Sequence, residues 1–121
     1  MKEKNNKTSV YFEHGYRYME LDEFQNAINE FDKYISINPE YYNSWYFRGS
    51  CKYALGQYEE AIKDFDKALE LIDGEDYHSL HFRGICEFRL GRYKYAACAD
   101  WKKAAELGSE EAAELLKKHC E

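Results

Sequence analysis

The chain repeats itself with a period of 34 and then 35 residues, and this period restricts the fold more than any other feature. Glycines at Gly15, Gly49 and Gly84 hold the same place in three successive units. A fixed period of this length indicates a stack of similar supersecondary units, each of which buries its apolar face only against its neighbours. The secondary structure of one unit then defines the whole fold.

Each unit contains two apolar segments that a short break separates. In the second segment, a small residue and an aromatic residue lie four apart: Ala27 with Phe31, Ala61 with Phe65, and Ala97 with Trp101. Residues four apart share one face of an α-helix. Each unit is therefore predicted to be a pair of helices. The first helices are expected near 8–20, 42–54 and 76–89, and the second helices near 23–36, 58–71 and 94–106.

Capping side chains suggest where two of these helices begin. Asp22 and Gln25 resemble a capping box at the start of the second helix of unit one. Asn38 precedes Pro39, which suits a capping side chain followed by the first helical residue of the next unit.

These residues resemble the tetratricopeptide repeat, a helix-turn-helix repeat of 34 residues that stacks into a right-handed superhelix. The match covers about 8 to 108 and is best in unit two, through Trp45, Gly49, Gly56, Gln57, Tyr58, Ala61, Phe65 and Ala68. The resemblance implies an all-α fold, a right-handed superhelical stack of three helix-turn-helix repeats with a C-terminal capping helix. The close of the chain is similar to that of small bacterial three-repeat proteins.

The expected domain organisation follows from the repeat boundaries. A polar N-terminal tail is expected over 1–7, repeats over about 8–41, 42–75 and 76–108, and the capping helix over 109–121. Gly108 can end a helix, and Ser109, followed by two glutamates, can start the capping helix. Unit three has one extra residue between Gly91 and Ala97, which predicts a longer turn or a bulge there.

The chain departs from the family at the place before each glycine, where the family usually has leucine. A buried Arg requires an anionic partner. Each unit has an acid before the aromatic of its second helix, so ion pairs between helices are predicted. The acid can come from the same unit or from the unit before, as Glu30 for Arg48 and Asp64 for Arg83. The same-unit pairs are His14 with Glu30, Arg48 with Asp64, and Arg83 with Asp100.

The inner face of the first helices is the candidate functional surface. In the family this face lines a concave groove that receives extended peptides. Here it is rich in aromatic and imidazole side chains, beyond what the second helices already supply for a core. A contiguous apolar patch of this kind usually marks a binding surface, whereas the alternative is that the rings only pack. The candidate groove residues are Phe12, Tyr16, Met19, Asn43, Tyr46, Phe47, Ser50, Tyr53, His78, His81, Phe82, Ile85, Phe88 and Arg89.

The groove residues also indicate which partner to expect. One subgroup of the family binds the acidic C-terminal tails of heat-shock chaperones through Lys, Asn and Arg side chains on this face. Those places hold Phe12, Tyr16, Phe47, His78 and Phe82 here, which cannot pair with a carboxylate as Lys or Arg would. An extended peptide or helix of another protein, apolar or aromatic-rich, is the expected ligand. The alternative is a self-associating module, either as part of a larger complex or as a homo-oligomer.

Charge and motifs exclude other classes of function. With 17 basic against 23 acidic residues and a net charge of -6, the chain lacks the basic face that nucleic-acid binding needs. No apolar stretch suits a signal peptide or membrane span, so a cytoplasmic protein is expected. Catalytic motifs are lacking, so we expect no enzyme and no cofactor. His78 and His81 have no third ligand at a matching spacing, so no metal site is expected.

The four cysteines, Cys51, Cys86, Cys98 and Cys120, show neither zinc-ligand spacing nor a disulfide framework. We therefore expect reduced and mostly buried thiols.

Overall fold

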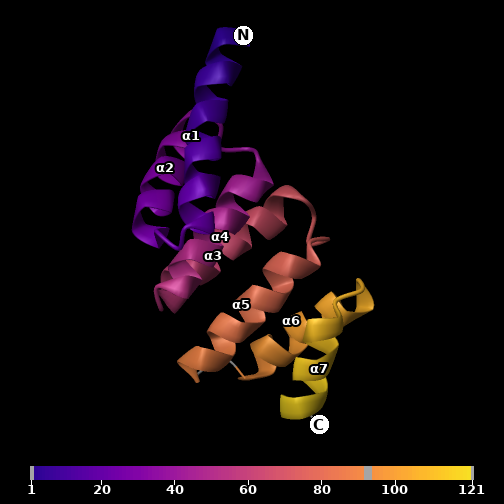
Figure 1. Ribbon diagram of the computed structural model, residues 1–121. Coiled ribbons are helices and arrows are strands. Elements are labelled where there is room, and N and C mark those ends of the chain that lie inside the picture. Colours follow the sequence, from indigo (N-terminus) through magenta and orange to yellow (C-terminus); the bar gives the residue numbers. More distant parts are fainter. Residues whose placement is uncertain (1, 92–93, 121) are drawn as a thin grey trace.

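The computed structural model describes residues 2–91 and 94–120, with side chains from Val10 onward. These residues form seven α-helices and no strand. Antiparallel helix pairs follow one another in a single stack that has the two termini at opposite ends (Figure 1). The predicted all-α repeat stack is confirmed. The helices are α1 (Lys2–Glu20), α2 (Phe24–Ile37), α3 (Tyr42–Ala54), α4 (Tyr58–Leu71), α5 (Tyr77–Leu90), α6 (Lys94–Glu106) and α7 (Glu110–His119).

The helix boundaries agree with the sequence except at the start of the chain. The bounds of α3, α4 and α6 coincide with the predicted ranges. However, α1 begins at Lys2, so the start predicted near residue 8 is wrong, and residues 2–7 continue the first helix instead of forming a separate tail. The extra residue of unit three falls on 92–93, which lie outside the described residues. None of the described helices is both long and apolar enough to cross a bilayer.

Each repeated glycine lies where the second helix of its unit packs against the first. A Cβ atom at Gly15 would lie 2.8 Å from Phe31 Cε1, and one at Gly84 would lie 2.5 Å from Trp101 Nε1. Because real Cβ atoms do not approach this closely, glycine is what allows the aromatic ring to reach the first helix. Phe31, Phe65 and Trp101 are consequently at most 1% exposed.

The following unit closes each core from the other side. The Phe47 ring stacks on Phe31 with 6.1 Å between centroids, and Phe82 stacks on Phe65 with 6.2 Å, both at an interplanar angle of 17°. For the third unit α7 has this role, since Leu115 packs into the cluster around Trp101. The core is therefore a row of three clusters between successive units rather than one centre.

Side-chain caps begin two of the helices. The Ser109 hydroxyl accepts a hydrogen bond from the Ala112 N–H at 3.1 Å, as the sequence predicted for the start of α7. At α5 the cap is Asp76, whose carboxylate accepts hydrogen bonds from the His78 N–H at 3.1 Å and the Ser79 hydroxyl at 2.6 Å. Both caps satisfy backbone donors that have no partner within the helix.

The other two predicted caps are wrong. Asp22 lies in the left-handed region with φ of 59°, and α2 begins after Glu23 without a side-chain cap, so Asp22 and Gln25 form no capping box. Asn38 ends α2 instead of starting α3, which begins at Tyr42. In both places the tight connection between stacked helices, rather than the local capping preference, determines the backbone.

The prediction of four reduced thiols is wrong for two of them. Cys98 on α6 and Cys120 after α7 form a disulfide, with Cα atoms 5.9 Å apart although the residues are 22 apart in sequence. The return of α7 along α6 brings them within bonding range, which spacing alone does not reveal. Cys51 and Cys86 are free and buried, as predicted. Burial raises the pKa of both thiols to about 12, so both stay protonated and unreactive at neutral pH.

Candidate functional site

Aromatic rings follow one another across α1, α3 and α5. Tyr16 meets the Phe47 ring edge-on with centroids 5.6 Å apart, and Phe47 contacts Tyr46 at 5.2 Å. Tyr46 then contacts two rings of the next unit, Phe82 at 6.2 Å and His78 at 5.9 Å. Three successive first helices are thus joined ring to ring.

The predicted groove residues differ in how far they are available to a ligand. Tyr16 is 40% exposed, and Tyr46 is half-buried and also contacts the core Phe65 ring at 6.1 Å. The residues with open or polar environments are Tyr16, Asn43, Ser50, His78, His81 and Arg89. The half-buried residues that pack against the core clusters are Phe12, Met19, Tyr46, Phe47, Tyr53, Phe82, Ile85 and Phe88.

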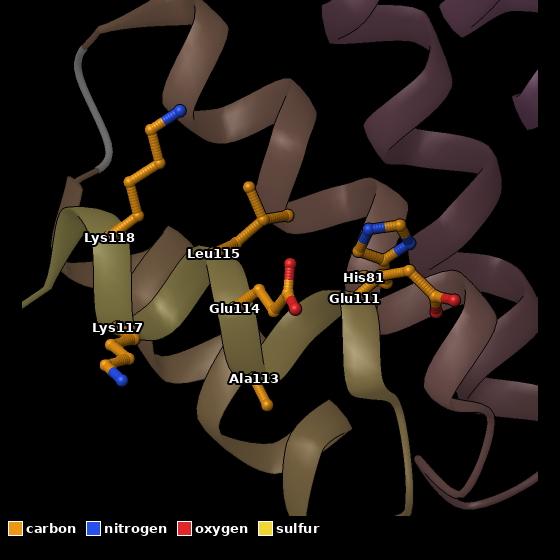
Figure 2. A pocket seen from close by; sticks show the side chains of 7 residues that line it. All are labelled: His81, Glu111, Ala113, Glu114, Leu115, Lys117 and Lys118. Atoms are coloured by element: carbon orange, nitrogen blue, oxygen red, sulfur yellow. The ribbon is translucent and has the colours of Figure 1, made fainter.

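A pocket of about 820 Å³ lies between α5 and α7, and Figure 2 shows the side chains that line it. His81 is its one lining residue from α5, and it contacts the Phe82 ring at 4.8 Å. Burial lowers the pKa of His81, so its imidazole is neutral at pH 7. The α7 side chains in the lining are Glu111, Ala113, Glu114, Leu115, Lys117 and Lys118.

The α7 residues of this pocket were not among the candidates from sequence, although a signal for them exists. His81 lies five residues after the N-cap Asp76, and Glu114 lies five residues after the N-cap Ser109. Aligned by their caps, α5 and α7 therefore present corresponding faces to the pocket. Aligning the units by their caps rather than by their glycines would have added α7 to the candidate groove, because α7 has Lys117 at the glycine place.

Both predicted arginines bind carboxylates of two units. Arg48 donates to both oxygens of Asp64 at 2.9 and 2.8 Å, and to Asp32 at 2.8 Å. Arg83 donates to both oxygens of Asp100 at 2.8 and 2.7 Å, and to Asp66 at 2.8 Å. Each guanidinium therefore joins its own helix to the second helices of two successive units.

The acids of the preceding units are not those named by the alternative from sequence. Asp32 binds Arg48 where Glu30 was considered, and Asp66 binds Arg83 where Asp64 was considered. Neither acid was a candidate from sequence, although the recurrence of Asp32 and Asp66 at matching places of units one and two was a usable signal. In unit one, His14 Nδ1 lies 3.4 Å from Glu30 Oε1, with a largely exposed imidazole, so this contact adds little stability.

Units two and three differ in charge beside these arginines. Lys52 Nζ lies 3.1 Å from Asp64 Oδ2, whereas the same place in unit three is Glu87. Burial, and then a hydrogen bond to Asp100, raises the pKa of Glu87 to about 9. Glu87 therefore holds its proton more strongly than an exposed glutamate does. Among the described residues, no three His, Cys, Asp or Glu side chains gather in a way that could hold a metal ion.

The stacked helix pairs and the aromatic face of the first helices define a helical repeat protein. In each of its three units, a glycine of the first helix contacts an aromatic ring of the second. The tetratricopeptide repeat family matches residues 8–41 and 42–72. An uncharacterized protein of Methanocaldococcus jannaschii is 30% identical over 69 residues, which cover 57% of this chain and 80% of that protein. The chain belongs to the tetratricopeptide repeat family.

Two further relatives extend the comparison. Small glutamine-rich tetratricopeptide repeat-containing protein 2 of Saccharomyces cerevisiae is 35% identical over 51 residues, which cover 42% of this chain but only 15% of the yeast protein. The solved first repeat domain of Spaghetti, bound to the HSP90 peptide SRMEEVD, has a TM-score of 0.86 at 24% identity. That similarity covers 93% of this chain and 90% of the other, and it concerns the fold.

Proposed function

We propose that this protein is a protein-interaction scaffold that binds an extended peptide or short helix of a partner along its first helices and catalyses no reaction. The observation that carries the proposal is the chain of rings from Tyr16 through Phe47 and Tyr46 to His78. These rings continue across three helices: Tyr16 and His78 are exposed, whereas Phe47 and Tyr46 are half-buried and also pack against the core clusters. Half-open aromatic side chains supply large contact area at low entropic cost.

The family supports this class of function. Tetratricopeptide repeats are generally scaffolds without catalytic activity, and the Spaghetti domain was solved with a peptide bound. The aromatic face of this chain favours apolar or aromatic contacts over a clamp for carboxylates. The cytoplasm is the proposed place of action, where cellular thiol reductants would act on the Cys98–Cys120 pair.

The test is partner capture from an extract of the native cell, with the purified protein immobilised. Tyr16→Ala is the test variant, because Tyr16 is 40% exposed and its truncation removes little buried surface. We expect it to weaken capture by about 1 kcal/mol or more if Tyr16 contacts the ligand. Tyr95→Ala on α6 is the matched control, since Tyr95 is 92% exposed and lies off the first helices. If wild type and folded Tyr16→Ala capture the partner equally well, the proposal that the partner binds in this groove is wrong.

Self-association is the second candidate, and exposed apolar side chains on α1 and in the turn that follows it favour it. Leu21 is 67% exposed and Val10 is 43% exposed on the first unit. Sedimentation velocity over a range of concentrations distinguishes the two. A dimer that Leu21→Ser dissociates supports self-association, whereas a monomer at all concentrations excludes it.

A further inference from the structure

The end of the groove at α7 has a different character from its aromatic part. Glu111 and Glu114 come from α7 and line the same pocket as His81 of α5. Figure 2 shows their side chains on the side of the pocket where the His81 ring lies. Both glutamates are exposed, and neither forms an ion pair with a described Lys or Arg side chain.

Among the residues that the structure describes, no cation forms an ion pair with a carboxylate at this end of the pocket. His81 carries no charge at pH 7, because burial lowers its pKa. Lys117 and Lys118 also line the pocket, but Figure 2 shows their side chains extending from α7 away from His81. Two carboxylates thus face the open volume beside an uncharged imidazole.

The neighbouring rings add to the attraction for a cation. His81 contacts Phe82, and Phe82 contacts Tyr46, so the acidic end is continuous with the aromatic chain. The face of an aromatic ring attracts Lys and Arg side chains, and a nearby carboxylate strengthens this attraction. The net charge of -6 also favours the approach of a basic segment over an acidic one.

We propose that the ligand of this groove is a basic peptide segment, with a Lys or Arg side chain between Glu111, Glu114 and His81 and its apolar side chains along the rings toward Tyr16. This inference rests on the proposed function and specifies its ligand. An acidic peptide is disfavoured, because its carboxylates would approach Glu111 and Glu114, whereas Lys117 and Lys118 extend away from His81. The charge of the ligand is thus opposite to that of the acidic chaperone tails.

The test compares two labelled peptides by fluorescence anisotropy. One is SRMEEVD, the acidic peptide found on the Spaghetti domain. The other is its charge-reversed counterpart SRMKKVK with an amidated C-terminus. We expect wild type to bind the basic peptide at least about tenfold more tightly than the acidic one at low salt. Raising NaCl from about 50 to about 300 mM should reduce that preference.

The double variant Glu111→Gln with Glu114→Gln should reduce the preference to about threefold or less. The matched control, Glu40→Gln with Glu75→Gln, removes the same charge from exposed sites outside the pocket. This control should retain the full preference for the basic peptide. Thermal unfolding of all variants shows that the comparison concerns folded protein. If the acidic peptide binds as tightly as the basic one, or if the double variant keeps the full preference, the inference is wrong.

Absence of binding by either peptide up to about 1 mM would also overturn the basic-ligand inference. It would leave the proposed function to the Tyr16→Ala capture experiment, which does not depend on these peptides. The two failures are therefore distinguishable.

Discussion

At the scale of single residues, one position in successive units determines how a buried charge is balanced. Lys52 supplies Asp64 with a second cation in unit two. Glu87 replaces it in unit three, where burial and the nearby Asp100 raise its pKa to about 9. Glu87 Oε1 is buried without a hydrogen-bond partner among the described residues. Unit three thus contains the less favourable polar cluster.

Glu87 should make stability depend on pH. Its pKa rises from 4.5 to about 9 on folding, so over that range the native state holds a proton that the unfolded chain has released, and stability falls as pH rises. Glu87→Gln keeps a hydrogen-bond donor and removes this titration. We expect the thermal unfolding temperatures of variant and wild type to differ little at pH 4. Between pH 4 and pH 8, the unfolding temperature of the variant should rise steadily relative to that of wild type. Glu75→Gln, on an exposed turn, is the control. An unchanged difference across that range would falsify the assignment.

Phe47 and Phe82 should matter for stability as well as for any ligand. They are half-buried and stack on the core rings of Phe31 and Phe65. Phe47→Ala and Phe82→Ala should each lower the free energy of unfolding by about 2–4 kcal/mol, near the range for buried Phe. Tyr16→Ala should cost less than about 1 kcal/mol. Urea unfolding measures all three, and equal losses would show that Tyr16 also belongs to the core.

At the scale of helices, each of the two arginines connects its own first helix to the second helices of two successive units. Arg48 on α3 connects α2 and α4 through Asp32 and Asp64. Arg83 on α5 connects α4 and α6 in the same way. The bidentate geometry orients the helices, which Lys at the same place could not do.

Removing these arginines should have unequal effects. Arg83→Ala leaves Asp100, which is 9% exposed, without a described cation, so we expect a loss of about 3 kcal/mol or more in the free energy of unfolding. Arg48→Ala should cost less, because Lys52 still lies 3.1 Å from Asp64. The two variants are compared by urea unfolding at pH 7. A larger loss for Arg48→Ala would contradict the charge balance inferred for the two units.

The disulfide should hold the last helix on the stack. A helix of ten residues such as α7 is marginal by itself, and Ala112 is its one fully buried residue. Replacing Cys98 and Cys120 by Ser should lower the free energy of unfolding by about 3 kcal/mol for a loop of this length. Thermal unfolding with and without a thiol reductant provides the measurement. Reductant should lower the wild-type midpoint and leave the double variant unchanged; a wild-type midpoint insensitive to reductant would show that α7 docks without the bond.

At the scale of the whole molecule, the buried contacts form a row of three clusters. A substitution that destabilises one end of the stack should therefore increase local unfolding mainly at that end. A methyl group at Gly84 would collide with the Trp101 ring. Gly84→Ala should therefore increase hydrogen exchange in α5, α6 and α7 far more than in α1 and α2. Mass spectrometry of peptides from each helix measures this. A uniform increase along the chain would show that the stack unfolds as one cooperative unit.

The period, the helix pairs and the arginines that need acidic partners were predictable from sequence, because they depend on spacing along a single chain. The repeated glycine and the aromatic residue of each second helix define one contact per unit. The helical bounds follow from residues three and four apart, which need no knowledge of distant segments. The start of α1 was not predictable in this way, because residues 2–7 lack apolar periodicity.

Which distant side chains meet was not predictable from sequence and became visible in the packing of the helices. Asp32 reaches Arg48, Cys120 reaches Cys98, and the rings of Phe47 and Phe82 stack on the core. All of these contacts depend on the angle and offset at which one helix pair packs on the next, which the spacing within a unit does not determine. The acidic end beside His81 exists for the same reason, since it forms only when α7 folds back onto α5 and α6.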